Sequence, residues 1–155
     1  MASNRVWMID TSVFLNILNV PGRNQDRERV LAQYERRIEN EDTFILPFTT
    51  VLETGNHIAQ IKDRSGSGSR RKQCAERFLI AVRASMDGSA PWTPMDFPTA
   101  PELSRYLDLH LFEYDAEAGR GFGDYLILRQ TDDYRRKTPG LETKIWSLDG
   151  HLGGS

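Results

Sequence analysis

Four acidic residues stand just after predicted strands or at the starts of predicted helices: Asp10, Glu53, Asp124 and Asp149. In an open parallel sheet, groups just past the carboxyl ends of the strands gather at one crevice. Carboxylates that meet there repel one another, and one takes up a proton unless a cation neutralises the group. Oxygen ligands of this kind suit Mg²⁺ or Mn²⁺. Because such an ion activates bound water and stabilises charge on phosphate, we expect phosphodiester hydrolysis.

Each acid also has an ordinary structural explanation when it is taken alone. Glu53 can be a favourable charge in a first helical turn. Asp124 after Gly123 can cap its helix, and Asp149 before Gly150 can form a simple turn. Only the combination of the four indicates a site.

The elements that must position these acids alternate along the chain. Short apolar runs predict strands over residues 5–9, 43–48, 91–98 and 143–148. Helical spacing of apolar residues predicts helices over 13–18, 24–39, 50–62, 70–86, 101–114 and 125–136. The alternation favours an α/β fold with a parallel sheet covered on both faces.

Length and composition bound the class of protein. The 155 residues suit a single domain over 1–155, and the net charge of −2 argues against a chain that coats nucleic acid by bulk positive charge. The single cysteine, Cys74, precludes an intrachain disulfide and favours a reducing compartment. No targeting or membrane segment is recognisable, so we expect a cytoplasmic protein without a membrane partner.

Four ordered motifs carry a resemblance to a known family: Val6-Trp-Met-Ile-Asp10-Thr11-Ser12, Thr50-Val-Leu-Glu53, Gly123-Asp124-Tyr-Leu-Ile127 and Trp146-Ser147-Leu-Asp149-Gly-His-Leu152. The chain resembles a PIN domain from about residue 5 to 152, and is most similar to the virulence-associated protein C (VapC-type) toxins of bacterial toxin–antitoxin pairs. Ser147 departs from the pattern, because threonine is commoner there.

The resemblance implies an α/β/α sandwich with a mainly parallel central sheet. It also implies an Mg²⁺- or Mn²⁺-dependent ribonuclease that forms a homodimer and is held by a protein antitoxin. By motif match, Asp10, Glu53, Asp124 and Asp149 are the metal-site acids. Thr11 or Ser12 resembles the hydroxyl that orients a ligand or water beside the first acid.

Charge is unevenly distributed along the chain. Residues 62–83 carry seven bases and two acids, a net charge of +5, whereas residues 99–118 carry one base and five acids, a net charge of −4. Phosphate contacts supply most of the non-specific affinity for nucleic acid. The candidates for contact with an RNA substrate are Arg70, Arg71, Lys72 and His57. A solvated helix face explains the basic run equally well.

Other polar and aromatic residues have simpler explanations. A partly buried, satisfied side chain is the competing interpretation of His57. Packing is expected for His110, Cys74 and the tryptophans Trp7, Trp92 and Trp146, and solvation for Asp132 and Asp133.

The predicted function is a metal-dependent endoribonuclease. The alternatives are a catalytically silent PIN-like interaction module and a PIN-like nuclease that acts on DNA.

Overall fold

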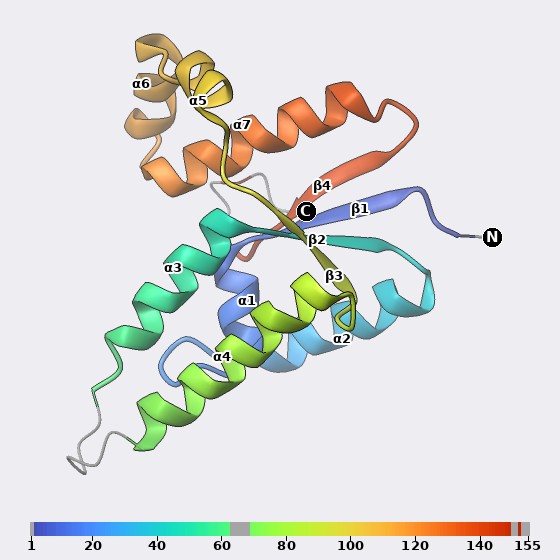
Figure 1. Cartoon of the computed structure of the whole chain (residues 1–155), viewed down its shortest axis with the longest axis vertical. Helices are drawn as coiled ribbons and strands as arrows, with labels where there is room; N and C mark the ends of the chain where they lie inside the picture. Colours follow the sequence, from blue (N-terminus) through green and yellow to red (C-terminus); the bar gives the residue numbers. More distant parts are fainter. Residues whose placement is uncertain (1, 63–68, 150–151, 153–155) are drawn as a thin grey trace.

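A computed structural model describes residues 2–62, 69–149 and 152 of the chain (Figure 1). The strands are β1 (Arg5–Ile9), β2 (Thr43–Pro47), β3 (Trp92–Met95) and β4 (Glu142–Trp146). The helices are α1 (Thr11–Ile17), α2 (Arg27–Glu39), α3 (Phe48–Ala59), α4 (Ser69–Asp87), α5 (Ala100–Tyr106), α6 (Leu109–Glu117) and α7 (Phe122–Lys137). Every predicted strand is present within a few residues of its expected limits.

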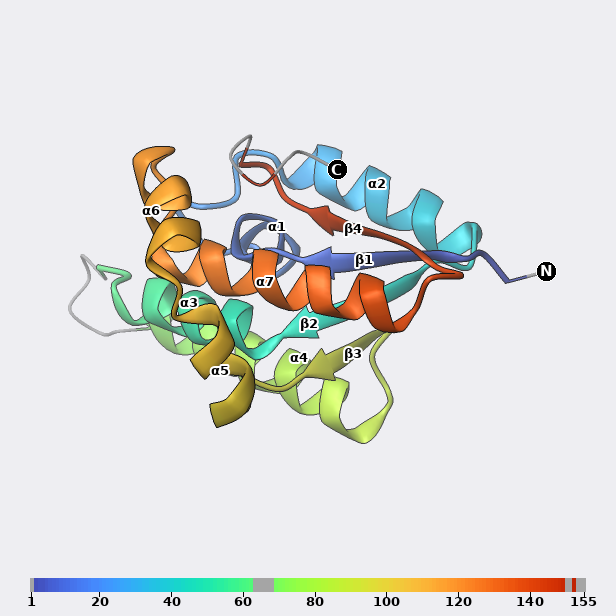
Figure 2. The same cartoon turned by 90° about the horizontal axis from the view of Figure 1, so that it is seen from above.

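The four strands form one parallel sheet in the order β3-β2-β1-β4. Figure 2 shows their arrows side by side and pointing the same way. Met8 of β1 lies opposite Ile45 of β2 and Ile145 of β4. Because all strands run in the same direction, their carboxyl ends meet at one edge, and the chain turns from β1 and β2 directly into α1 and α3 there.

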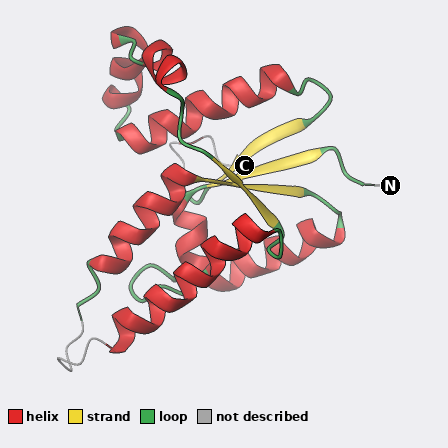
Figure 3. Ribbon diagram, in the orientation of Figure 1, coloured by secondary structure: helices red, strands yellow, loops and turns green. Residues whose placement is uncertain are grey.

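Side chains alternate between the two faces of the sheet, as the pleat requires. Trp7, Phe44 and Trp146 belong to the larger core, which is completed by α1, α2, α3 and α4. Val6, Met8, Ile45 and Ile145 belong to a second core with Ile127 of α7. Helices therefore cover both faces (Figure 3), which confirms the predicted three-layer α/β/α sandwich. The predicted burial of the three tryptophans and of Cys74 is also confirmed.

The predicted helix over 101–114 is wrong, because the structure has two helices there. Asp108 lies in extended backbone and caps α6, accepting a hydrogen bond from the Leu111 N–H at 3.0 Å. The capping geometry separates α5 from α6. Of the apolar residues in this segment, Tyr106 is buried against α7, whereas Leu107 and Tyr114 are 66% and 73% accessible, and His110 is exposed rather than packed.

Helix α4 is present as predicted, but its buried side is rotated from the expected one. Cys74 and Ser85 are the buried residues, whereas Leu79 and Met86, which belong to the apolar spacing that predicted this helix, are exposed. The indole N–H of Trp92 donates to the Ala81 carbonyl at 3.3 Å, so β3 meets the helix at a small residue. The core contacts of α4 therefore come from Cys74, small residues such as Ala81 and the half-buried Phe78, and the exposed Leu79 and Met86 do not take part.

The run Ser65-Gly-Ser-Gly-Ser69 is typical of a flexible connector. Its first four residues lie outside the described residues, and Ser69 begins α4. Among the helices that the structure describes, none has the length and apolar character needed to cross a bilayer.

Candidate functional site

Asp10 is the first residue after β1 and holds two roles at once. It is the N-cap of α1, with extended backbone, and its N–H donates to the Trp146 carbonyl at 3.0 Å. Its carboxylate oxygen Oδ2 accepts from the N–H of Ser12 at 3.4 Å and from the Ser12 hydroxyl at 2.9 Å. Only 4% of Asp10 is accessible, so the carboxylate is fixed at the carboxyl edge of the sheet.

Two serines join this acid to the last motif. The Ser147 hydroxyl donates to Asp10 Oδ2 at 2.8 Å and accepts from the Asp149 N–H at 2.9 Å. The Ser12 hydroxyl in turn accepts from the Leu148 N–H at 3.0 Å. Asp149 is thereby held two residues beyond the serine that binds Asp10. The sequence singled out Ser147 only as a departure from the family pattern, and its contact with Asp10 went unpredicted.

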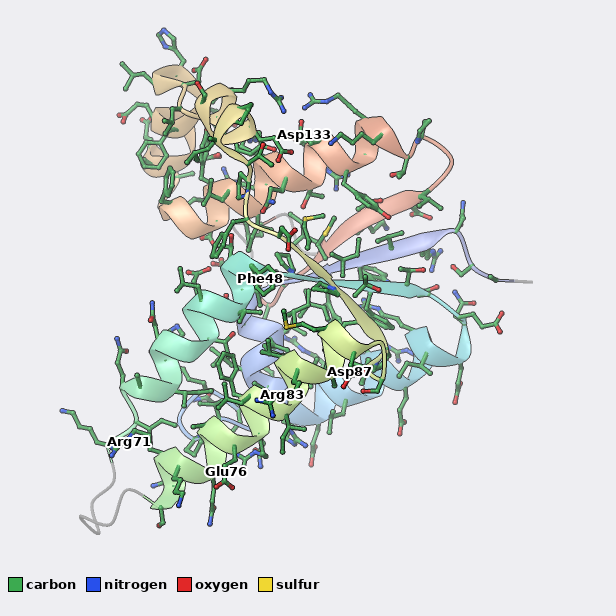
Figure 4. The ribbon with its side chains drawn as sticks, in the orientation of Figure 1. Phe48, Arg71, Glu76, Arg83, Asp87 and Asp133 are labelled. Atoms are coloured by element: carbon green, nitrogen blue, oxygen red, sulfur yellow. The ribbon has the colours of Figure 1, made fainter. Side chains whose placement is uncertain are left out.

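Glu53 reaches the same edge from α3. The helix begins at Phe48, directly after β2, and Figure 4 labels this residue. The buried Thr50 hydroxyl donates to the Ile9 carbonyl at 2.7 Å and ties the first turn of α3 to the end of β1. Thr50 lies inside the first turn of α3, so its hydroxyl is available for this contact and does not cap the helix. One turn further, Glu53 Oε1 accepts from the Thr11 hydroxyl at 3.2 Å.

The first turn of α7 completes the edge. A Cβ atom on Gly123 would lie 2.7 Å from Glu53 Oε1 and 2.8 Å from its Cδ, so the absence of a side chain there lets the carboxylate approach. Asp124 is the next residue of this turn. Unpaired backbone N–H groups and the helix dipole favour negative charge at a helix start. In the sequence, Gly123 is only the residue before Asp124. Its contact with Glu53 is apparent only in three dimensions.

The charges of Asp10 and Asp124 both act on Glu53 and change its pKa. Burial raises the pKa of Glu53, and the charges of Asp10 and Asp124 raise it further, against the hydrogen bond from Thr11. A carboxyl in these surroundings binds a proton or a cation more readily than one in water. The arrangement therefore favours a positive species at this edge.

The carboxylates at this edge suit a hydrated metal ion. Over residues 2–62, 69–149 and 152, no three acidic, histidine or cysteine side chains form a preassembled metal cluster. Mg²⁺ commonly keeps several waters and is held by only one or two carboxylates together with substrate phosphates. Asp10, Glu53 and Asp124 fit that kind of site, and Asp149 adjoins it through Ser147.

The structure separates the four candidates for substrate contact. His57 and Arg70 line one cavity of about 490 Å³. Arg71 instead donates to the Ile61 carbonyl at 3.2 Å near the start of α4 (Figure 4), and Lys72 lines a different, mainly apolar groove. His57 is partly buried, as its competing interpretation required.

The expected solvation of Asp133 is wrong. This residue of α7 is 6% accessible and accepts hydrogen bonds from the Tyr106 hydroxyl and from the guanidinium groups of Arg105 and Arg136 (Figure 4). Nine residues along α7 separate Asp133 from Asp124, about 13 Å of helix. Asp133 therefore belongs to the packing of α5 on α7 and not to the acidic edge.

Comparison with known proteins identifies a structural relative. The sequence matches no known family, and no curated protein is significantly similar to it. The fold is similar to a chain in the crystal structure of VapBC2 from Rickettsia felis bound to a DNA fragment from their promoter. The TM-score is 0.54 at 15% identity, over 92% of this chain and 99% of that one. At this identity the similarity establishes the fold alone.

Proposed function

We propose that this chain is an Mg²⁺- or Mn²⁺-dependent endoribonuclease that hydrolyses RNA phosphodiester bonds. The observation that carries the proposal is Glu53, whose carboxylate fits against Gly123 with its pKa raised by burial and by Asp10 and Asp124. Asp10, Glu53 and Asp124 come from separate segments and interact here, whereas buried structural carboxylates are normally paired with bases. A cation that recruits phosphate accounts for the arrangement.

The residues of the chain would share the work as follows. Asp10, Asp124 and Asp149 hold the ion directly or through water, and Glu53 positions the attacking water or holds a second ion. Ser12 and Ser147 fix the Asp10 carboxylate, and Thr11 orients Glu53. When bound, the ion lowers the pKa of its water and offsets the negative charge of the phosphate.

We further propose that the chain is the toxin of a toxin–antitoxin pair and works as a homodimer. The fold is similar to that of a chain in the VapBC2 complex, and four sequence motifs independently resemble VapC-type toxins. The expected partners are an RNA substrate and a protein antitoxin. Co-purification with the product of an adjacent small gene, and the mass of the purified protein in solution, test the two assembly proposals.

Cleavage of labelled RNA tests the nuclease. Mg²⁺ or Mn²⁺ should support cleavage that EDTA abolishes, and Asp10→Asn should lower kcat/KM by about 10²–10⁴-fold, the range for a lost catalytic group. Asn is also a good N-cap, so the variant should keep the fold. Equal cleavage by the variant, or in EDTA, would refute the nuclease. Single-stranded DNA run in parallel reports whether the same site acts on DNA.

A further inference from the structure

A basic cavity lies beside the acidic edge. It has a volume of about 490 Å³ and is bounded by the turn after α1, the end of α3 and the start of α4. Its polar lining is Arg23, His57, Gln60, Lys62 and Arg70. None of the described residues that line it is acidic. A second cavity of about 390 Å³ shares Pro21, Gly22 and Arg70 with the first, so the concave surface continues past it.

The cavity follows the acidic edge along one helix. His57 is four residues beyond Glu53 in α3, which is one turn, or about 6 Å of rise. Residues four apart lie on the same face of a helix. An extended ligand that has one group beside Glu53 therefore places its next group beside His57.

The charges in the cavity favour an anion. Burial and the nearby charge of Arg23 both lower the pKa of His57. Positive groups that face one another across a concave surface repel, and an anion between them removes the repulsion. The same anion would draw a proton back onto His57.

We propose that this cavity binds a backbone phosphate of single-stranded RNA next to the bond that is cleaved. Arg23, Lys62 and Arg70 supply the charge, and His57 supplies a hydrogen bond. The assignment rests on the proposed nuclease function. A flexible single strand can place one phosphate in the cavity while the adjacent phosphate lies at the acidic edge. The phosphates of a stiff duplex are held on its outer surface and cannot enter a concave site in this way. An acidic protein segment carries similar charge, but continuity with the acidic edge favours RNA.

Paired charge variants test the cavity. The test variant is Arg23→Gln/Arg70→Gln. The control is Arg83→Gln/Lys144→Gln, which removes the same charge at two exposed positions outside the cavity. Binding of single-stranded RNA is measured in the Asp10→Asn background. The test pair should weaken binding by about 10-fold and reduce the salt slope by about 0.7, the value for one neutralised phosphate of a single strand. If the control pair weakens RNA binding equally, the loss is due to the net charge of the protein and not to the cavity, and the assignment is overturned.

Cleavage kinetics give a second readout. With oligomeric RNA, the test pair should raise KM by about 10-fold and leave kcat within about twofold, as for a lost binding contact. A dinucleoside monophosphate has only the phosphate that is cleaved, so the test pair should cleave it as the wild type does. An equal loss of cleavage with this minimal substrate would show that Arg23 and Arg70 act on the phosphate that is cleaved, and it would overturn the proposal.

A titration with inorganic phosphate separates this proposal from the nuclease itself. Phosphate should raise the pKa of His57, followed by NMR and assigned with His57→Gln, in the wild type but not in the test pair. If the wild type cleaves no RNA, the nuclease proposal fails and this titration decides the cavity: no rise in the His57 pKa overturns it. An acidic peptide that displaces bound RNA at equal concentration would assign the cavity to a protein partner instead.

Discussion

Two acids in this chain, the buried Asp133 and the half-buried Glu53, have opposite surroundings. Asp133 accepts from Tyr106, Arg105 and Arg136, and although burial alone would raise its pKa, these donors lower it. Glu53 is half-buried and interacts with the charges of Asp10 and Asp124, and its pKa is raised, by partial burial first and then by the two charges. Among the described residues, Asp133 has basic partners, whereas the charges that act on Glu53 are the negative ones of Asp10 and Asp124.

The difference teaches how to tell a structural acid from a functional one. An acid whose counter-charges belong to the same chain is complete on folding and stabilises the packing of α5 on α7. An acid surrounded by other acids is completed only by something from solution. Four perturbations sharpen or break this comparison.

The largest effect is expected from Gly123→Ala. The new Cβ would meet the Glu53 carboxylate at 2.7 Å. The carboxylate ends a flexible side chain and can move aside, so stability should hold while kcat/KM falls about 10–100-fold, as when the support of a metal ligand is lost. The matched control is Gly121→Ala, where a Cβ meets no atom within 4 Å. Cleavage assays and thermal melts should show full activity for the control, and equal activity for both variants would contradict the role of Gly123.

Metal should stabilise the acidic edge. At 100 times its dissociation constant, an ion bound only to the folded chain contributes about 2.7 kcal/mol. Thermal melts with Mg²⁺ or Mn²⁺ should therefore shift upwards by several degrees relative to EDTA, and Asp10→Asn should reduce the shift. Asp133→Asn serves as the control and should shift as much as the wild type. No shift at millimolar ion would contradict a metal site.

Asp133→Asn should destabilise the fold without affecting catalysis. The loss of a buried charged partner is worth about 1–3 kcal/mol here, because Arg105 and Arg136 are largely exposed. The pKa of Asp133 is lowered on folding, so its contribution is present above its unfolded pKa, about 3.9, and is lost as the pH falls through the folded value. Urea unfolding should show a large difference from the wild type at pH 7 and a small one at pH 3. A difference independent of pH would show that packing, not charge, is responsible.

Glu53→Gln should have the smallest effect on stability, with the opposite sign. Because folding raises the pKa of Glu53, its stabilising contribution is present below the unfolded pKa and is lost as the pH rises through the folded value. In EDTA at pH 8 the variant should melt at or slightly above the wild-type temperature, and at pH 4 it should not gain. Gln retains the Oε1 acceptor for Thr11. A clear destabilisation at pH 8 would show that Glu53 already has its partner within the chain.

The fold was predictable because its signals are local. Apolar runs such as residues 5–9 and 43–48 mark strands that are buried on both faces, and a carboxylate directly after such a strand reaches the carboxyl edge whatever the remaining packing. The pattern failed where a short polar cap decided the outcome, as at Asp108, or where small residues met the sheet, as in α4.

The supporting residues of the site were not predictable from the sequence. Ser147 contacts Asp10 across 137 positions, and Gly123 meets Glu53 across 70, so neither contact leaves a local pattern. The substrate candidates illustrate the same point. Arg70 and Lys72 are two positions apart on one helix and therefore line different hollows, a distinction that a count of charges cannot make.

The capping role of Asp10 has an evolutionary consequence. Aspartate and asparagine codons differ by one base, and both residues are favoured at the start of a helix. A single nucleotide change at this position would therefore remove the charge of the proposed metal ligand while keeping a favourable helix start. Under the proposed function, active and silent versions of this chain would lie one mutation apart.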